Sequence, residues 1–160
     1  MKNEMKEFLA EGFRRYKQAY HVISEFSTNT QNELQDIIIK RKNWGSAFKP
    51  KELNKVKSYK YGDPGIFNAQ IEGTIEGKPA TLRISVNWFQ SESDYPFYEI
   101  WFYDGPESAY EKTGSFKTKG RIEMSGADHR GLKMYPDPND FDLERDYNAL
   151  IDEFVRTISI

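Results

Sequence analysis

Residues 67–103 read FNAQIEGTIEGKPATLRISVNWFQSESDYPFYEIWFY, and this stretch decides the fold. In residues 67–76 apolar or small side chains alternate with polar ones, and residues 81–88 repeat the pattern after Gly77-Lys78-Pro79. Alternation with a period of two is typical of a half-buried strand, and the short Gly-containing connection predicts an antiparallel hairpin. Residues 97–103 are apolar or aromatic at almost every position. They predict an inner strand that is covered, at least in part, on both faces.

An amphipathic helix is predicted ahead of the sheet by an apolar stripe at spacings of three and four: Met5, Leu9, Phe13, Tyr16, Tyr20 and Ile23. Residues 27–30, STNT, interrupt it, and Thr30 with Glu33 fits a capping box. We therefore expect a second helix from Gln31 to about Lys42. The same spacing continues through the interruption, so one long helix over residues 3–42 is the alternative.

Further strands and a last helix are predicted on both sides of the central stretch. Residues 56–61 predict an edge strand, residues 113–118 and 121–125 predict a hairpin, and residues 132–134 add a last strand. Residues 139–158 predict a C-terminal helix, with Asn139 or Asp140 as its N-cap. Its apolar stripe consists of Leu143, Tyr147, Leu150, Ile151, Phe154, Val155 and Ile158.

The order of these elements predicts an α+β fold. We expect a single domain over residues 1–160, with an N-terminal helical region (1–44), an antiparallel sheet (55–135) and a C-terminal helix (139–158). Helices before and after a run of strands favour helices packed on one face of an antiparallel meander sheet of about five strands.

Composition limits the location and chemistry of the chain. It has no cysteine, which excludes disulfides and thiolate metal sites and fits a reducing compartment. It has no apolar run long enough to cross a membrane and no apolar segment near residue 1 typical of a secretory signal. We therefore expect a cytoplasmic protein with no membrane partner.

Catalytic signals are missing from the sequence. His21 and His129 are the only histidines, and neither has partners at the spacing of a zinc site. The chain also has no phosphate-binding glycine loop and no nucleophile motif. We expect no catalytic residues, no metal and no cofactor, and hence a protein that is not an enzyme.

Acids and aromatic residues gather in the second half of the central stretch. Residues 90–111 contain six acids and no base. Rings provide contact area and carboxylates attract cations, so this pattern suits a surface that binds a basic protein. The leading hypothesis is a non-enzymatic protein-binding domain, with an immunity-type inhibitor of a toxin as one form. Its candidate residues are Glu92, Asp94, Tyr95, Asp104, Glu107, Tyr110 and Glu111.

A basic segment gives an alternative. Residues 40–60 contain eight basic residues and one acid, Glu52. Lysines neutralise phosphates and aromatic rings stack on bases, so this segment suits nucleic acid. The candidate residues are Lys40, Arg41, Lys42, Trp44, Lys49, Lys51, Lys55, Lys57 and Tyr59 within segment 40–61.

Two further alternatives stay open. A pocket between the sheet and the helices, lined by aromatic residues, would make the protein a small ligand-binding domain or an enzyme. The apolar stripe of the N-terminal helix would also suit the seam of a homodimer.

Overall fold

The structure is a computed structural model that describes residues 20–53, 57–60, 66–87, 97–126, 128–137, 140 and 142–159. Within these ranges, the side chains of residues 20–29, 57–60 and 66 are not described. The described elements, in chain order, are α2 (Tyr20–Lys40), β1 (Phe48–Pro50), β2 (Lys57–Lys60), β3 (Ile66–Ile75), β4 (Lys78–Asn87), β5 (Phe97–Tyr103), α3 (Glu107–Gly114), β6 (Ile122–Ser125), β7 (Gly131–Met134) and α4 (Leu143–Ser159).

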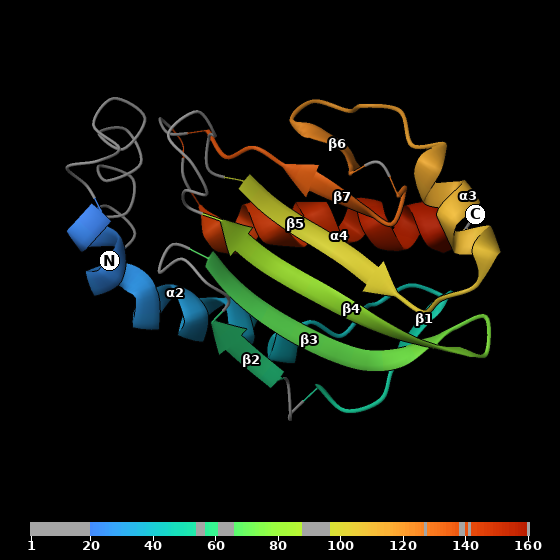
Figure 1. Ribbon diagram of the computed structural model, residues 1–160, viewed down its shortest axis with the longest axis horizontal. Coiled ribbons are helices and arrows are strands. Elements are labelled where there is room, and N and C mark those ends of the chain that lie inside the picture. The colour runs from blue at the N-terminus through green and yellow to red at the C-terminus, as the bar shows by residue number, and fades with distance from the viewer. Residues whose placement is uncertain are drawn as a thin grey trace.

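One antiparallel sheet is the centre of the fold (Figure 1). Six strands lie in the order β1–β3–β4–β5–β7–β6, and the short strand β2 pairs with β3 beside β1. The predicted α+β class and antiparallel pairing are confirmed. The expected five strands are too few, and the sheet is not a simple meander, because β7 lies between β5 and β6.

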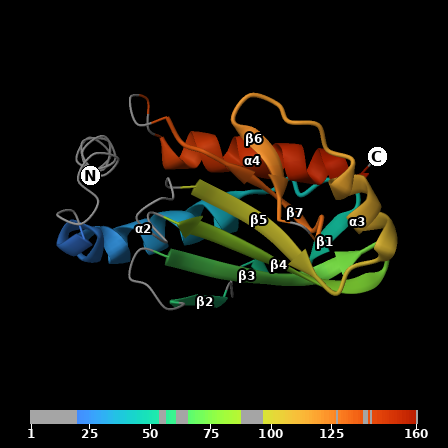
Figure 2. The same cartoon turned by 45° about the horizontal axis from the view of Figure 1, so that its top comes forward.

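The helices α2 and α4 cover one face of the sheet, so the molecule has two layers (Figures 1 and 2). The predicted alternation in β3 and β4 turns one set of side chains toward these helices, and β5 follows the same pattern. The strands contribute the following buried residues to this core: Phe67, Ala69, Ile71, Ile75, Leu82, Ile84, Val86, Tyr98, Ile100 and Phe102. The predicted apolar stripe of α4 is buried against them in full.

The favoured break at residues 27–30 is wrong, because α2 runs without interruption from Tyr20 to Lys40. Thr30 is fully buried, and Leu34, Ile37 and Ile38 continue the same stripe into the core. Ser, Thr and Asn lower helix propensity by no more than about 0.7 kcal/mol per residue, which the burial of this stripe outweighs. Residues 1–19, which include most of the predicted N-terminal stripe, lie outside the described residues.

Two strand predictions also need correction. Residues 113–118 form no strand, because Thr113 and Gly114 end α3; instead β6 pairs with β7 to form the hairpin. The strand β1 was not predicted at all. It pairs antiparallel with the end of β3. At Gly73 of β3 a Cβ atom would lie 2.3 Å from the Lys49 carbonyl oxygen, so this close approach requires glycine.

The C-terminal helix begins at Leu143, four residues later than predicted. Asp142 caps it, because its Oδ1 accepts a hydrogen bond from the backbone N–H of Arg145 at 3.1 Å. Asn139 lies outside the described residues, and Asp140 does not have this role. Asp140 instead pairs with the Arg145 guanidinium at 3.1 Å.

Tyr147 joins α4 to the sheet at the centre of the core. Its hydroxyl accepts the backbone N–H of Ser85 at 3.1 Å and faces the carbonyl oxygens of Ser85 and Glu99. These two residues are opposite each other in the β4–β5 ladder. The ring is fully buried beside Tyr98, and burial raises the pKa of the hydroxyl well above its usual value.

Asp146 is a buried carboxylate near the start of α4. Its Oδ1 lies 3.1 Å from the Arg145 guanidinium and 3.6 Å from that of Arg121, and its Oδ2 has no hydrogen-bond partner among the described residues. Burial raises the pKa of this carboxyl group above its usual 3.8. Burial thus disfavours the charged form, and the arginines compensate for it only in part.

We expect Tyr147→Phe to lower the free energy of unfolding by about 1–3 kcal/mol, because buried backbone groups lose their partner while the ring remains. Urea denaturation measures the change. Tyr110→Phe is the matched control: it removes the hydroxyl of a half-exposed ring, and we expect a change below about 0.5 kcal/mol. Equal losses in the two variants would contradict the role of Tyr147.

The raised pKa of Asp146 predicts a pH dependence. Its contribution to stability is fully present below the usual carboxyl pKa of 3.8 and is lost as the pH rises through the folded-state pKa. We therefore expect the free energy of unfolding of the wild type, minus that of Asp146→Asn, to decrease as the pH rises above about 3.8. Denaturation of both proteins across a pH series tests this. A difference that grows with pH would contradict it.

Candidate protein-binding surface

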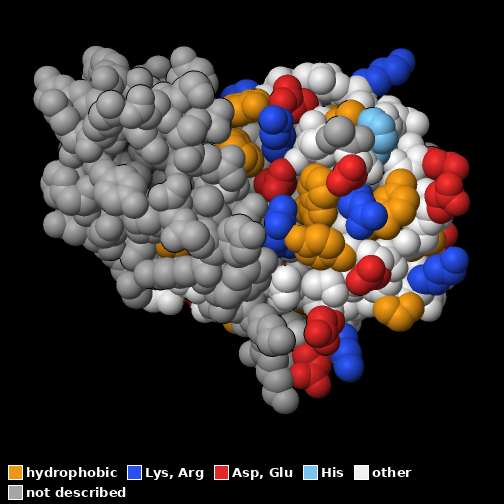
Figure 3. All heavy atoms as spheres, in the orientation of Figure 1, with side chains coloured by type: hydrophobic (Ala, Val, Ile, Leu, Met, Phe, Trp, Pro, Cys, Tyr) orange, Lys and Arg blue, Asp and Glu red, His pale blue; other side chains and the backbone are white. Residues whose placement is uncertain are grey.

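The face of the sheet opposite α2 and α4 carries the second set of alternating side chains. We call it the outer face and define it by Arg83 of β4, Phe97, Glu99, Trp101 and Tyr103 of β5, and Lys133 of β7. Their positions alternate with core residues in the same strands, which places them together on one side. Hydrophobic and charged side chains lie intermixed on the described part of this face (Figure 3).

Three aromatic rings of β5 lie half-exposed on the outer face. Phe97, Trp101 and Tyr103 are partly accessible, whereas Tyr98, Ile100 and Phe102 between them are buried. The ring of Trp101 lies close over Gly126, where a Cβ atom would come within 2.9 Å of it. β5 therefore presents a row of rings held in place by the sheet beneath.

Cations lie over these rings. The Arg83 guanidinium is 5.7 Å from the ring centroid of Trp101 and 5.6 Å from that of Tyr103. The Lys133 ammonium is 5.6 Å from the centroid of Phe97 and 5.4 Å from that of Tyr135. Cation–π contacts of this kind favour fixed ring positions.

Carboxylates neutralise the same two cations. Glu99 accepts a hydrogen bond from Arg83 Nη2 at 3.2 Å and a second one from the hydroxyl of Ser125. Glu123 lies 3.4 Å from Lys133 Nζ. A hydrogen bond with Tyr135 raises the pKa of Lys133, with burial acting against it. Around its rings, the outer face is thus balanced in charge.

Buried N–H groups without acceptors are a second property of this face. The Nε of Arg83, the Nε1 of Trp101 and the Nδ2 of Asn68 are buried and have no hydrogen-bond partner among the described residues. Arg83 and Trp101 are directly opposite each other in the β4–β5 ladder. Since buried N–H groups are normally paired, this local excess of donors is unusual.

The predicted acidic residues that the structure describes lie at the end of β5 and on α3. Asp104, Glu107 and Glu111 are exposed, and no ion pair within the described chain involves them. Tyr110 lies in α3 rather than in a loop. Its ring is half-buried, stacks on Phe102 at a centroid distance of 5.1 Å, and carries Arg130 at 4.6 Å. Glu92, Asp94 and Tyr95 lie outside the described residues.

Two described candidates of the basic segment, Trp44 and Arg41, are bound within the fold. Trp44 is only 3% exposed, and its indole donates to the carbonyl of Arg41 at 3.2 Å. The Arg41 guanidinium is bound to Asn148 and Asp152 of α4. Arg41 therefore joins the end of α2 to α4, and the other described candidates, Lys40, Lys42, Lys49 and Lys51, are exposed.

The remaining members of that segment are described in part or not at all. Lys57 and Tyr59 lie in the edge strand β2, which confirms the strand, but their side chains are not described. Lys55 lies outside the described residues.

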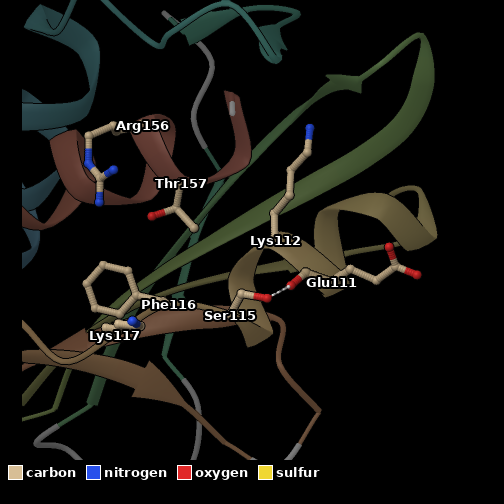
Figure 4. A pocket seen from close by; sticks show the side chains of 7 residues that line it. All are labelled: Glu111, Lys112, Ser115, Phe116, Lys117, Arg156 and Thr157. Atoms are coloured by element: carbon tan, nitrogen blue, oxygen red, sulfur yellow. Dashed lines mark hydrogen bonds between the residues drawn. The ribbon is translucent and has the colours of Figure 1, made fainter.

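A cavity of about 500 Å³ lies between the C-terminal ends of α3 and α4 (Figure 4). Two of its cations are paired within the protein: Lys112 binds Glu76 at 3.2 Å, and the Arg156 guanidinium binds Glu153 at 2.9 Å. The hydroxyls of Ser115 and Thr157 donate to backbone carbonyls. His129 does not line this cavity; its Nδ1 lies 2.9 Å from the sulfur of Met124.

Clusters of metal-ligating side chains and long apolar helices are two further features that would indicate a function. In the part of the chain that the structure describes, no three His, Cys, Asp or Glu side chains come together where they could hold a metal ion. None of the described helices has the length and apolar character needed to span a membrane.

The residues that the sequence interpretation missed are those of the outer face, chiefly Arg83, Trp101, Tyr103 and Lys133. Residues 97–103 were expected to be covered on both faces, so their rings were assigned mainly to the core. The signal that identifies them was present, because Phe97, Trp101 and Tyr103 share the parity of the polar Glu99, whereas Tyr98, Ile100 and Phe102 share the opposite one.

No protein-family model matches this chain, and no curated protein or solved structure shows significant similarity to it.

Proposed function

We propose that the protein is a non-catalytic binding domain for another protein, and that it binds with the outer face and the adjoining acids of α3. The observation that carries the proposal is the row of half-exposed rings of Phe97, Trp101 and Tyr103 on a rigid strand. Tryptophan and tyrosine supply much of the binding free energy in protein interfaces, because their large rings lose little conformational entropy on binding.

The fixed position of these rings supports the proposal. The sheet holds the backbone, Gly126 packs beneath Trp101, and Arg83 lies over both Trp101 and Tyr103. A surface that is ordered before binding has less conformational entropy to lose when a partner arrives.

The acids of α3 indicate the charge of the partner. Asp104 directly follows β5, and Glu107 and Glu111 lie exposed on α3 beyond it. Exposed carboxylates accelerate the encounter with a basic protein and favour one orientation. A basic partner fits this rim, and an immunity-type inhibitor of a basic toxin is one biological form that the proposal includes.

Site-specific photocrosslinking tests the surface. A benzophenone amino acid at Tyr103 is expected to crosslink a protein partner in the native cell, whereas the same group at Glu144, an exposed position on α4, is not. The crosslinked species should persist after nuclease treatment and be identified by mass spectrometry. Crosslinks that depend on nucleic acid, or that form equally at both positions, would contradict the proposal.

Charge reversal tests the acidic rim with the partner identified in this way. We expect Glu107→Lys with Glu111→Lys to slow association about tenfold or more at low salt and to weaken its salt dependence. Asp36→Lys with Glu144→Lys makes the same change in net charge at exposed positions of α2 and α4 and should have much less effect. Equal effects of the two pairs in stopped-flow association kinetics would sink the role of the rim.

A further inference from the structure

Around Trp101, the outer face has buried hydrogen-bond donors that lack acceptors among the described residues. The Nε of Arg83 and the Nε1 of Trp101 have no acceptor among the described residues, and the Nδ2 of Asn68 on the same face shares this property. The carboxylate of Glu99, by contrast, is already bound to Arg83 and Ser125. A partner segment that pairs these N–H groups must therefore bring acceptors.

A proline-rich segment has this property. Proline has no backbone N–H, so the polyproline II conformation leaves its carbonyl groups free as acceptors and needs no internal hydrogen bonds. Its rings pack well on aromatic side chains, and its stiff backbone loses little conformational entropy on binding. An ordinary extended strand, in contrast, would bring an N–H group with almost every residue.

We propose that the outer face binds a proline-rich segment of the partner protein in the polyproline II conformation, with its carbonyl groups accepting from Trp101 Nε1 and Arg83 Nε. This inference rests on the proposed function and specifies the chemistry of its partner. The rings of Phe97, Trp101 and Tyr103 form the surface on which the prolines pack.

The geometry sets the length and the ends of the segment. From Phe97 to Tyr103 the strand advances six residues, about 20 Å, which about seven residues of polyproline II cover. Asp104, Glu107 and Glu111 follow at one end of this row. Basic residues therefore flank the proline-rich segment on the side of α3.

The two N–H groups lie beneath the molecular surface, so binding includes a side-chain movement. The Arg83 side chain is 29% exposed, and Glu99 at 3.2 Å is its ion-pair partner in the described chain. Turning Arg83 outward gives an acceptor access to the indole beneath. Rotamer changes of this kind are common at interfaces whose backbone stays fixed.

Single-stranded nucleic acid is the competing occupant, because bases also stack on aromatic rings. Its phosphates would meet the exposed acids of α3. A proline-rich peptide with basic ends avoids this repulsion, and so the charges favour the peptide.

Heteronuclear NMR of the ¹⁵N-labelled full chain tests the inference through the indole N–H signals of its three tryptophans. Trp101→Phe assigns the Trp101 signal. The probes are two peptides of seven prolines, one with two arginines at its N-terminus and the other with two arginines at its C-terminus. Matched peptides with alanine in place of proline, and an oligouridylate, are the comparisons. We expect the proline peptides to shift the Trp101 indole signal saturably while that of Trp44, buried in the core, stays in place.

We also expect the alanine peptides to bind at least tenfold more weakly and the oligouridylate not to shift the signal. Unchanged Trp101 signals with both proline peptides at millimolar concentration would overturn the inference, as would equal binding of the alanine peptides or a shift caused by the oligouridylate. In the first two cases a protein crosslinked at Tyr103 would still support the proposed function. If that crosslink were also absent, both the proline-rich inference and the proposed function would be contradicted.

Discussion

The contact between α4 and the central strands is the constraint on which the rest of the structure depends. The apolar stripe of α4 is buried in the core, where the helix packs on β5, β7 and β1. Hydrophobic burial alone is non-directional and would allow the helix to slide. The Tyr147 hydroxyl removes this freedom, because it bonds to backbone groups of Ser85 and Glu99 that are opposite each other in the sheet.

This arrangement also determines what the outer face becomes. Once the core takes Tyr98, Ile100 and Phe102, the period of the strand forces Phe97, Trp101 and Tyr103 to the other side, where no apolar layer of described helices receives them. Cations and carboxylates of neighbouring strands stabilise these rings instead. Exposed apolar groups that gather on one face of a folded protein often mark an interaction site, and our proposal of a binding role for this face rests on this.

Local sequence signals failed where tertiary packing acted against them. The polar residues 27–30 resemble a helix break, but Thr30 and Leu34 belong to one buried stripe, and their burial keeps α2 continuous. The favoured hairpin at residues 113–118 had suitable turn residues, yet Ala109 and Thr113 are buried and hold α3 in helical form to Gly114. In both places the side chains that decide the structure contact residues distant in the chain.

The α+β class, the three central strands, the buried sides of β3 and β4, and the apolar stripe of α4 follow from the sequence alone, because periods of two and about 3.6 residues express local backbone geometry. The sheet order, with β7 between β5 and β6, and the close pairing of β1 with β3 at Gly73 depend on the tertiary structure. It also brought Arg83, Trp101 and Lys133 together and took Trp44 and Arg41 into the contact between α2 and α4. These outcomes depend on contacts between residues far apart in the chain, and no local period encodes them.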